Sequence, residues 1–180
     1  MRAFVAIRIP EVESLSKPVR ELSSAGDMKT YGPGGLHLTL CFIGEIGEGY
    51  VDDMTDAIKE AAEGVDPFTI SIRGMGSFPG RRGPRIAWVG AGSNGILESL
   101  SERITDNLDA KGVGHDLKKF VPHITIGRAR DFNGSPSASR IIEEYGKTEF
   151  LTYDCDRVSL YNSELRPEGA TYSIVSEVLL

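Results

Sequence analysis

One short pattern occurs twice in this chain and limits how the chain can fold. The segment GLHLTLCFIG places His37 and Thr39 two positions apart, with leucines at the positions between and beside them. In a β-strand, residues i and i+2 point to the same face, so the histidine and the threonine share one face and the leucines take the other, buried one. The segment VPHITIGR repeats this arrangement with His123 and Thr125. Two strands that each present a histidine and a threonine are therefore predicted.

Along the chain, segments with the hydrophobic period of a strand alternate with segments that have the period of a helix. The first of these helices is expected to end near Gly26. The two motifs stand about half of the 180-residue chain apart, which favours duplication of a small unit, giving an α+β fold with two lobes that face each other across a cleft. The predicted strands span residues 2–9, 36–43, 67–73, 84–89, 121–127, 148–153, 156–162 and 170–178, and the predicted helices span 11–24, 49–63, 95–110 and 137–145.

Composition excludes several classes of protein. No run approaches the roughly 18 apolar residues that a membrane span needs, and the opening residues are typical of a first strand and not of a signal peptide. The two cysteines, Cys41 and Cys155, have no CxxC spacing, which favours reduced thiols in a cytoplasmic protein. Nothing in the sequence indicates an obligate protein partner.

Positive charge is concentrated near the motifs, although the net charge is −6. One cluster lies between Arg73 and Arg85, and the other brackets the second motif. Each cluster alone is typical of a solvated loop. Because both clusters flank the H-x-T motifs, a second interpretation is a basic rim around the cleft that attracts a polyanion. The residues of this expected rim are Arg73, Arg81, Arg82, Arg85, Lys118, Lys119, Arg128 and Arg130.

Two imidazoles and two hydroxyls that converge on one space favour a particular chemistry. Histidine titrates near pH ~6.5, so at neutral pH one imidazole can be neutral while its partner is protonated. A neutral imidazole removes a proton from a nucleophile, and a protonated one gives a proton to a leaving group. Threonine hydroxyls can donate hydrogen bonds to the oxygens of a phosphate held between them. The pattern predicts in-line attack at phosphorus, with the nucleophile and the leaving group on opposite sides.

Two other interpretations compete with this one. A zinc site would need His115 as its third ligand, but no acidic or cysteine ligand stands at a helpful spacing and the H-E-x-x-H pattern is absent. A dinucleotide site is indicated by G-x-G-x-x-G at Gly90, Gly92 and Gly95, between a strand and a helix. No acidic residue ends a following strand about twenty positions on, since Asp116 precedes that strand, so a flexible strand-to-helix turn is the alternative explanation.

With both motifs established, the chain resembles the two-histidine phosphoesterase superfamily. More narrowly, it is similar to the bacterial and archaeal RNA 2′,3′-cyclic phosphodiesterases, long labelled 2′-5′ RNA ligases. The segments LHLTLCFIGE and FVPHITIGRAR resemble the two motifs of that family. MRAFVAIRIP resembles its opening strand, FPGRRGPRIAWVG its central loop and tryptophan strand, and VSLYNSELRPEGATYSIV its closing hairpin.

The resemblance implies one two-lobed domain over residues 1–180, with one motif in each lobe, antiparallel-rich sheets and helices on the outside. It also implies that no metal or other cofactor takes part. It implies hydrolysis of an RNA-terminal 2′,3′-cyclic phosphate to a 2′-phosphate, and reversible 2′-5′ joining of RNA ends as a second activity. In the family's usual assignment, His37 is the proton donor, His123 is the proton acceptor, and Thr39 and Thr125 hold the phosphate. The pseudo-symmetry of the motifs leaves the donor and acceptor interchangeable on sequence grounds.

Two further residues are candidates for substrate binding. Arg128, next to the second motif, matches a phosphate or substrate contact. Phe4, on the opening strand, could stack on a base or lie in the core. The function alternatives are a phosphodiesterase for small cyclic nucleotides and a module that binds RNA ends without turning them over.

Overall fold

The computed structural model describes residues 1–25, 27–32, 34–167 and 169–180. Gly26, near which the first helix was expected to end, lies outside them. The α-helices are α1 (Glu13–Ser24), α2 (Val51–Ala62), α3 (Ile96–Ala110) and α4 (Ala138–Glu144), with a short 3-10 turn, Glu48–Tyr50, before α2. The strands are β1 (Arg2–Arg8), β2 (Met28–Thr30), β3 (His37–Glu45), β4 (Phe68–Pro79), β5 (Pro84–Gly92), β6 (His123–Ala129), β7 (Glu149–Cys155), β8 (Arg157–Arg166) and β9 (Gly169–Leu179).

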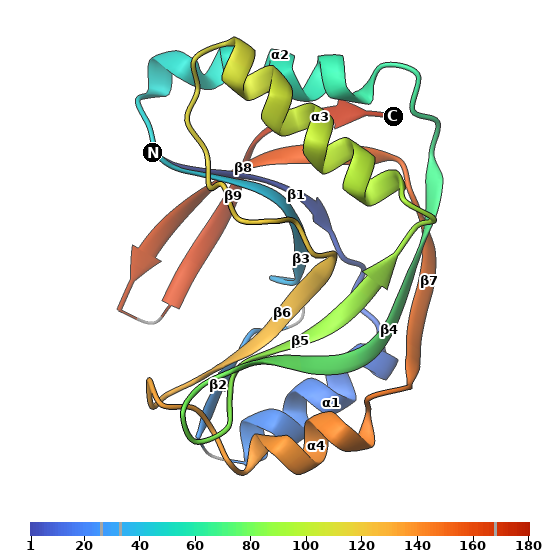
Figure 1. Ribbon diagram of the computed structural model, residues 1–180, viewed down its shortest axis with the longest axis vertical. Coiled ribbons are helices and arrows are strands. Elements are labelled where there is room, and N and C mark those ends of the chain that lie inside the picture. Colours follow the sequence, from blue (N-terminus) through green and yellow to red (C-terminus); the bar gives the residue numbers. More distant parts are fainter. Residues whose placement is uncertain (26, 33, 168) are drawn as a thin grey trace.

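The described strands form one antiparallel sheet in the order β7-β4-β5-β6-β3-β1-β8-β9, with β2 paired to β6. The sheet curls so that its two halves face each other (Figure 1). We call β3, β1, β8 and β9 with α2 and α3 lobe A, and β7, β4, β5, β6 and β2 with α1 and α4 lobe B. The helices pack on the outer faces of their lobes. This arrangement confirms the predicted α+β class, with helices outside and antiparallel strands around a cleft.

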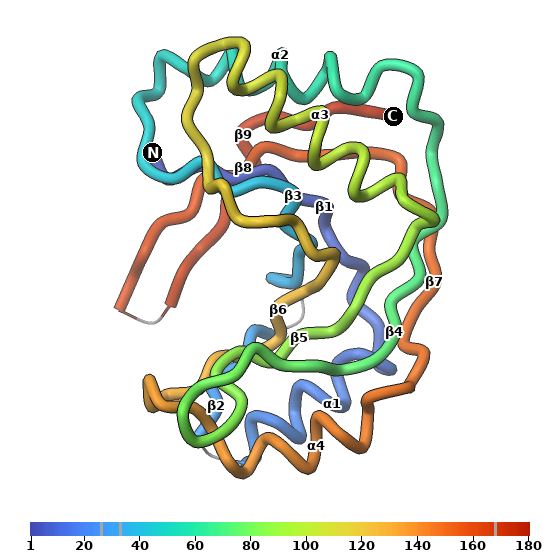
Figure 2. Tube along the Cα trace, viewed as in Figure 1, coloured from blue at the N-terminus to red at the C-terminus, as the bar shows by residue number. Residues whose placement is uncertain are grey.

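The lobes do not correspond to the two halves of the chain, which corrects the simplest form of the expected duplication. Lobe A combines β1 and β3 from the start of the chain with β8 and β9 from its end (Figure 2). Helix α1 follows β1 in sequence but packs on lobe B. The chain therefore crosses between lobes repeatedly, and the H-x-T strands β3 and β6 become neighbours where the lobes join.

Strand β1 has two apolar faces because it lies inside the sheet. Ala3, Val5 and Ile7 belong to the main core, whereas Phe4 and Ala6 pack on the concave face in a second cluster with Tyr161. Such a strand reads as a continuous apolar run and not as an alternating one. The RAFVAIR segment has this character.

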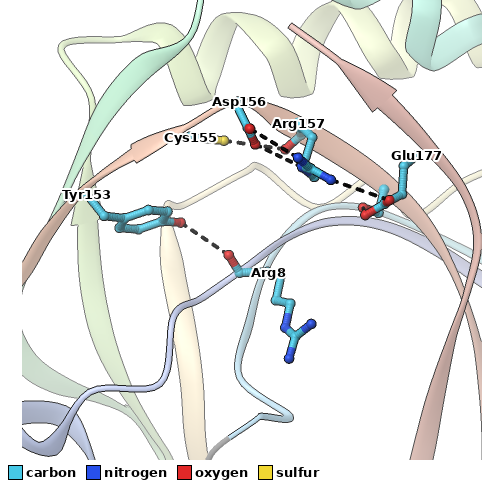
Figure 3. A network of polar contacts seen from close by, with 7 residues as sticks. Arg8, Tyr153, Cys155, Asp156, Arg157 and Glu177 are labelled. Carbon is cyan, nitrogen blue, oxygen red and sulfur yellow. Dashed lines mark hydrogen bonds and ion pairs between the residues drawn. The ribbon is translucent and has the colours of Figure 1, made fainter.

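A hydrogen bond from the edge strand β7 also joins the two lobes. The phenol of Tyr153, on β7 of lobe B, donates a hydrogen bond of 3.4 Å to the carbonyl oxygen of Arg8, on β1 of lobe A (Figure 3). Beside it, Arg157 forms ion pairs with Asp156 and Glu177. Burial raises the pKa of Tyr153, so this phenol remains a hydrogen-bond donor. Within the described part of the chain, no helix combines enough length and hydropathy to span a bilayer.

The G-x-G-x-x-G segment forms a strand-to-helix turn. Gly95, the residue before α3, has a φ of +89°, a conformation that glycine adopts at no steric cost. The Ser93 hydroxyl accepts a hydrogen bond of 2.9 Å from the Leu97 N–H and so caps the helix. The N–H groups of Ile96 and Leu97, which open α3, thus both bond to Ser93, which favours the turn over a dinucleotide site.

Candidate active site

The register between β3 and β6 brings the two motifs together. Leu38 pairs with Ile124 in an antiparallel ladder, and both side chains are fully buried. In such a ladder, the neighbours on the opposite face are His37 with Thr125 and Thr39 with His123. Each histidine therefore lies across from the threonine of the other motif.

These four side chains line one cavity of about 570 Å³. Arg128 lines the same cavity, as do aromatic residues from both lobes. The cavity is thus mainly apolar with a few convergent polar groups, which is the usual character of a substrate site. The structure brings together the two histidines, the two threonines and Arg128 of the sequence prediction.

Both imidazoles are held in the same way. Nδ1 of His37 lies 2.9 Å from the carbonyl oxygen of Gly35, and Nδ1 of His123 lies 2.6 Å from that of Val121. A carbonyl oxygen only accepts hydrogen bonds, so each Nδ1 carries the proton. Nε2 of each ring is therefore left to exchange a proton with a substrate.

Aromatic rings surround His37. The Phe4 ring centroid lies 5.0 Å away, and the Tyr172 ring meets the imidazole edge-on at 4.8 Å. Burial lowers the pKa of His37, although the hydrogen bond to Gly35 opposes the shift. Phe4 itself is 1% exposed and is not part of the cavity lining, which favours its core role, as support for His37, over base stacking.

A different pair of rings supports His123. Phe78 lies edge-on to the imidazole at 5.2 Å, and Trp88 lies at 6.4 Å. The Trp88 ring lies across β4 at Gly76, where a Cβ would fall 2.2 Å from the indole Cη2. A larger residue at this position would displace the indole that packs beside His123. Gly76 therefore contributes to the shape of the site.

Arg128 is positioned by an element that sequence reasoning missed. Strand β2 pairs with β6, and Tyr31, the residue after it, accepts a hydrogen bond of 3.0 Å from Arg128 Nε through its phenol oxygen. Three strand residues are too few for a periodicity signal, so neither β2 nor Tyr31 could be identified from the sequence. Tyr172, Phe42 and Phe78 were missed as cavity residues as well.

The expected basic rim is formed only in part. Lys118, Lys119 and Arg128 line the cavity. The arginines of the β4–β5 segment do not: Arg85 lies 3.8 Å from the ring centre of Phe132, and Arg73 lies 3.9 Å from a carboxylate oxygen on β7. Arg81, Arg82 and Arg130 also lie outside the cavity lining.

Two other reactive side chains, those of His115 and Cys41, add no catalytic group to the two histidines. His115 Nε2 lies 3.2 Å from Asp109 and its Nδ1 lies 3.0 Å from the Asp116 carbonyl oxygen, so the three-histidine arrangement required for a zinc site is not formed. Over the described residues, no group of three or more His, Cys, Asp or Glu side chains is arranged to hold a metal ion. Cys41 lines the cavity, but burial, reinforced by nearby carboxylates, raises the pKa of its thiol to about 12. A protonated thiol is a poor nucleophile.

Comparison with known proteins places these features in a family. The model of the 2′-5′ RNA ligase superfamily matches residues 11–166. An RNA 2′,3′-cyclic phosphodiesterase of Archaeoglobus fulgidus is 33% identical over 174 residues, which are 96% of each chain. One of Methanocaldococcus jannaschii is 30% identical over 179 residues, 98% of this chain and 99% of the relative.

Solved structures share the same architecture. TT0787 of Thermus thermophilus is 27% identical and superposes with a TM-score of 0.78, covering 100% of this chain and 98% of that one. LigT of Escherichia coli, at 20% identity, gives a TM-score of 0.71 over 99% of this chain and 96% of its own, which supports the fold alone.

Proposed function

The chain belongs to the 2′-5′ RNA ligase superfamily, and from this membership and its cleft we propose that it hydrolyses the 2′,3′-cyclic phosphate at an RNA end to a 2′-phosphate. The observation that supports this function most strongly is the pairing of Leu38 with Ile124, which gathers both H-x-T motifs on one face in one cavity. Relatives of nearly the same length bear the name RNA 2′,3′-cyclic phosphodiesterase.

The proposed reaction is a single displacement at phosphorus. His123 takes a proton from water through Nε2, and the water oxygen forms a bond to phosphorus. The bond between phosphorus and O3′ breaks, and His37 gives its proton to O3′. The products are a 3′-hydroxyl and a 2′-phosphate, and one proton has moved from His37 to the product while one has moved from water to His123. A 5′-hydroxyl in place of water would give the 2′-5′ joining reaction.

The remaining side chains are assigned to the phosphate. The hydroxyls of Thr39 and Thr125 donate to the non-bridging oxygens, one from each lobe. Arg128 supplies positive charge, and its hydrogen bond to Tyr31 limits the directions in which the guanidinium can point. This arrangement neutralises the charge that develops on phosphorus oxygens without requiring a metal ion.

The environment of His37 adds a condition to its role as donor. Burial lowers the pKa of His37 and so favours the neutral imidazole in the free protein. An anionic phosphate close to the ring stabilises the protonated form. We therefore infer that the phosphate of the bound substrate raises the pKa of His37 before the displacement.

A product assay tests the proposed function. RNA ending in a 2′,3′-cyclic phosphate, incubated with the protein and EDTA, is expected to give a terminal 2′-phosphate, because the histidines transfer the protons themselves. Phosphorus NMR of the product distinguishes the 2′ from the 3′ position. A 3′-phosphate product would contradict the donor and acceptor geometry, and loss of activity restored by zinc would contradict the metal-independent mechanism. Turnover of nucleoside cyclic phosphates alone would favour the small-molecule alternative.

The dependence of rate on pH gives a second prediction. One imidazole must be neutral and the other protonated, so kcat/KM, which reports the free enzyme, should follow a bell-shaped profile. Because burial lowers the pKa of His37, the lower of the two apparent pKa values of the pair should lie below ~6.5, the ordinary value for histidine. Both limbs of kcat, which reports the complex, should lie at higher pH because the bound phosphate favours protonated imidazole. Limbs at the same pH in both profiles would disprove this effect of the substrate. The two apparent pKa values belong to the coupled pair of histidines, so neither limb is assigned to one residue.

A further inference from the structure

The cavity extends from the H-x-T side chains in two directions, and its two ends are built differently. One end is formed by Tyr31 and Arg128 of lobe B together with Tyr172 of the β8–β9 hairpin. Near the tip of that hairpin, a Cβ at Gly169 would lie 3.4 Å from Nζ of Lys29, whose side chain reaches the hairpin from β2. The hairpin extends from lobe A (Figure 1), so this end of the cavity is lined by side chains from both lobes.

The opposite end is lined by Phe42 and by the loop over residues 113–122. The Asp116 N–H donates a hydrogen bond of 2.8 Å to the Phe42 carbonyl oxygen, and the Pro122 carbonyl oxygen accepts one of 3.2 Å from Ala91. The loop is therefore fixed beside the strand. Phe42 is 44% exposed, an unusual degree of exposure for an aromatic ring on a sheet.

An irregularity in β3 turns Phe42 into the cleft. The pairing of β3 with β1 passes from Thr39 to Cys41 and skips Leu40. One extra residue shifts the alternation of the strand, so Thr39 and Phe42 face the same side although they are three positions apart. The Phe42 ring lies 5.6 Å from that of Phe4 on the concave face. From the strand rise, its Cα is about 10 Å or less from that of Thr39.

Positive charge accompanies this ring. Lys118, Lys119 and Phe120 line the cavity beside Phe42. Lys118 is highly exposed and lies 3.3 Å from an oxygen of Asp116, whereas Lys119 has no carboxylate within ion-pair distance in the described part of the chain. Exposed aromatic rings next to lysines are the usual construction of a surface that binds single-stranded nucleic acid.

We propose that this end of the cleft is the path of the RNA chain on the 5′ side of the cyclic phosphate, an inference that rests on the proposed function. The base of the nucleotide before the terminal one stacks on Phe42, and its phosphate faces Lys118 and Lys119. The chain leaves at this end because the side chains of Tyr31, Arg128 and Tyr172 occupy the other. The site therefore selects oligonucleotide ends over nucleoside cyclic phosphates.

The test compares two substrates. The ratio of kcat/KM for a tetranucleotide 2′,3′-cyclic phosphate to kcat/KM for a nucleoside 2′,3′-cyclic phosphate is measured for the natural protein and for variants. Phe42→Ala should lower this ratio roughly 5- to 100-fold, the range for loss of one stacking ring. The double variant Lys118→Ala, Lys119→Ala should reduce the salt dependence of log KM for the tetranucleotide by a slope of roughly 1.4, about 0.7 for each lost contact.

Matched controls come from outside this path. Phe132→Ala removes an aromatic ring that is 72% exposed and lies outside the cavity, so the ratio should not change. Arg166→Ala removes a cation from the β8–β9 hairpin and should not change it either. The lysine variant keeps the inference testable if Phe42→Ala does not fold.

Each result bears on the path or on the function. Equal efficiency of the natural protein on both substrates would overturn the path and leave the proposed function standing. A Phe42→Ala variant that loses both activities equally would assign Phe42 to the terminal nucleotide and overturn the inference. A lower ratio for Arg166→Ala with no change for Phe42→Ala would place the chain under the hairpin. No hydrolysis of either substrate would overturn the proposed function and, with it, this inference.

Discussion

Replacing His37 with alanine should lower kcat on an RNA 2′,3′-cyclic phosphate by roughly 10²–10⁴-fold, the usual cost of losing a positioned acid or base. His123→Ala should have an effect of the same order, because both imidazoles line one cavity and each presents Nε2. Single-turnover rates of the purified variants, with circular dichroism to confirm folding, provide the measurement.

The combined variant sharpens this prediction. Because the two histidines act in one displacement, the double variant should be far less impaired than the product of the single effects. Thr39→Ala and Thr125→Ala should each cost less, since each removes one hydrogen bond to phosphate. His115→Ala is the matched control, because this histidine is held by Asp109 of α3 and by the Asp116 carbonyl oxygen, outside the cavity lining. Full activity in either single cleft variant would remove that histidine from the chemistry.

Leu38→Ala should lower the free energy of unfolding by about 2–5 kcal/mol, the range for a buried leucine truncated in a core. Leu38 is fully buried and pairs with Ile124 where the two H-x-T strands meet. The cavity left there also loosens the register that aligns the motifs, so catalytic activity should fall with stability. Urea unfolding followed by fluorescence measures the first effect, and the product assay measures the second.

Leu117→Ala serves as the control for this truncation. Leu117 is 87% exposed, so removal of the same atoms should change the free energy of unfolding by less than about 0.5 kcal/mol. If Leu38→Ala were as stable as this control, the junction between the lobes would not depend on the Leu38–Ile124 pair.

Most of the elements could be predicted from the sequence because their periodicity is strong. The LHLTL and HITI segments alternate over enough residues to show which side chains face the core and which face the cleft. Helices α2 and α3 have clear apolar stripes. The sequence could not show which residues far apart along the chain lie close together in space. Tyr31 and Arg128 are 97 positions apart, and their hydrogen bond depends on β2, which has three residues.

The charged residues illustrate a second limit. Proximity in sequence to a motif suggested that Arg81 and Arg82 belong to the same rim as Lys118 and Lys119. The β4–β5 hairpin instead continues to Pro79 before it turns, and Arg82 donates its backbone N–H to Asn133. The longer strand carries these arginines away from the cavity. Phe42 was hidden for the opposite reason, since a skipped residue in β3 reverses its face and no sequence pattern marks the skip.

The place of β1 in the sheet determines the order in which the molecule can be completed during synthesis. β1 pairs with β3 on one side and with β8 on the other, yet β8 begins at Arg157 and is translated near the end of the chain. Until then, an apolar strand has one unpaired edge, which is the kind of surface that associates with other chains. β4 to β7 are synthesised before β8, so lobe B can assemble while lobe A still lacks β8 and β9. Both motifs are translated before β8 and β9, but the pocket around His37 also needs Tyr172 of β9, so the nascent chain acquires its complete cleft only after β8 and β9 have left the ribosome.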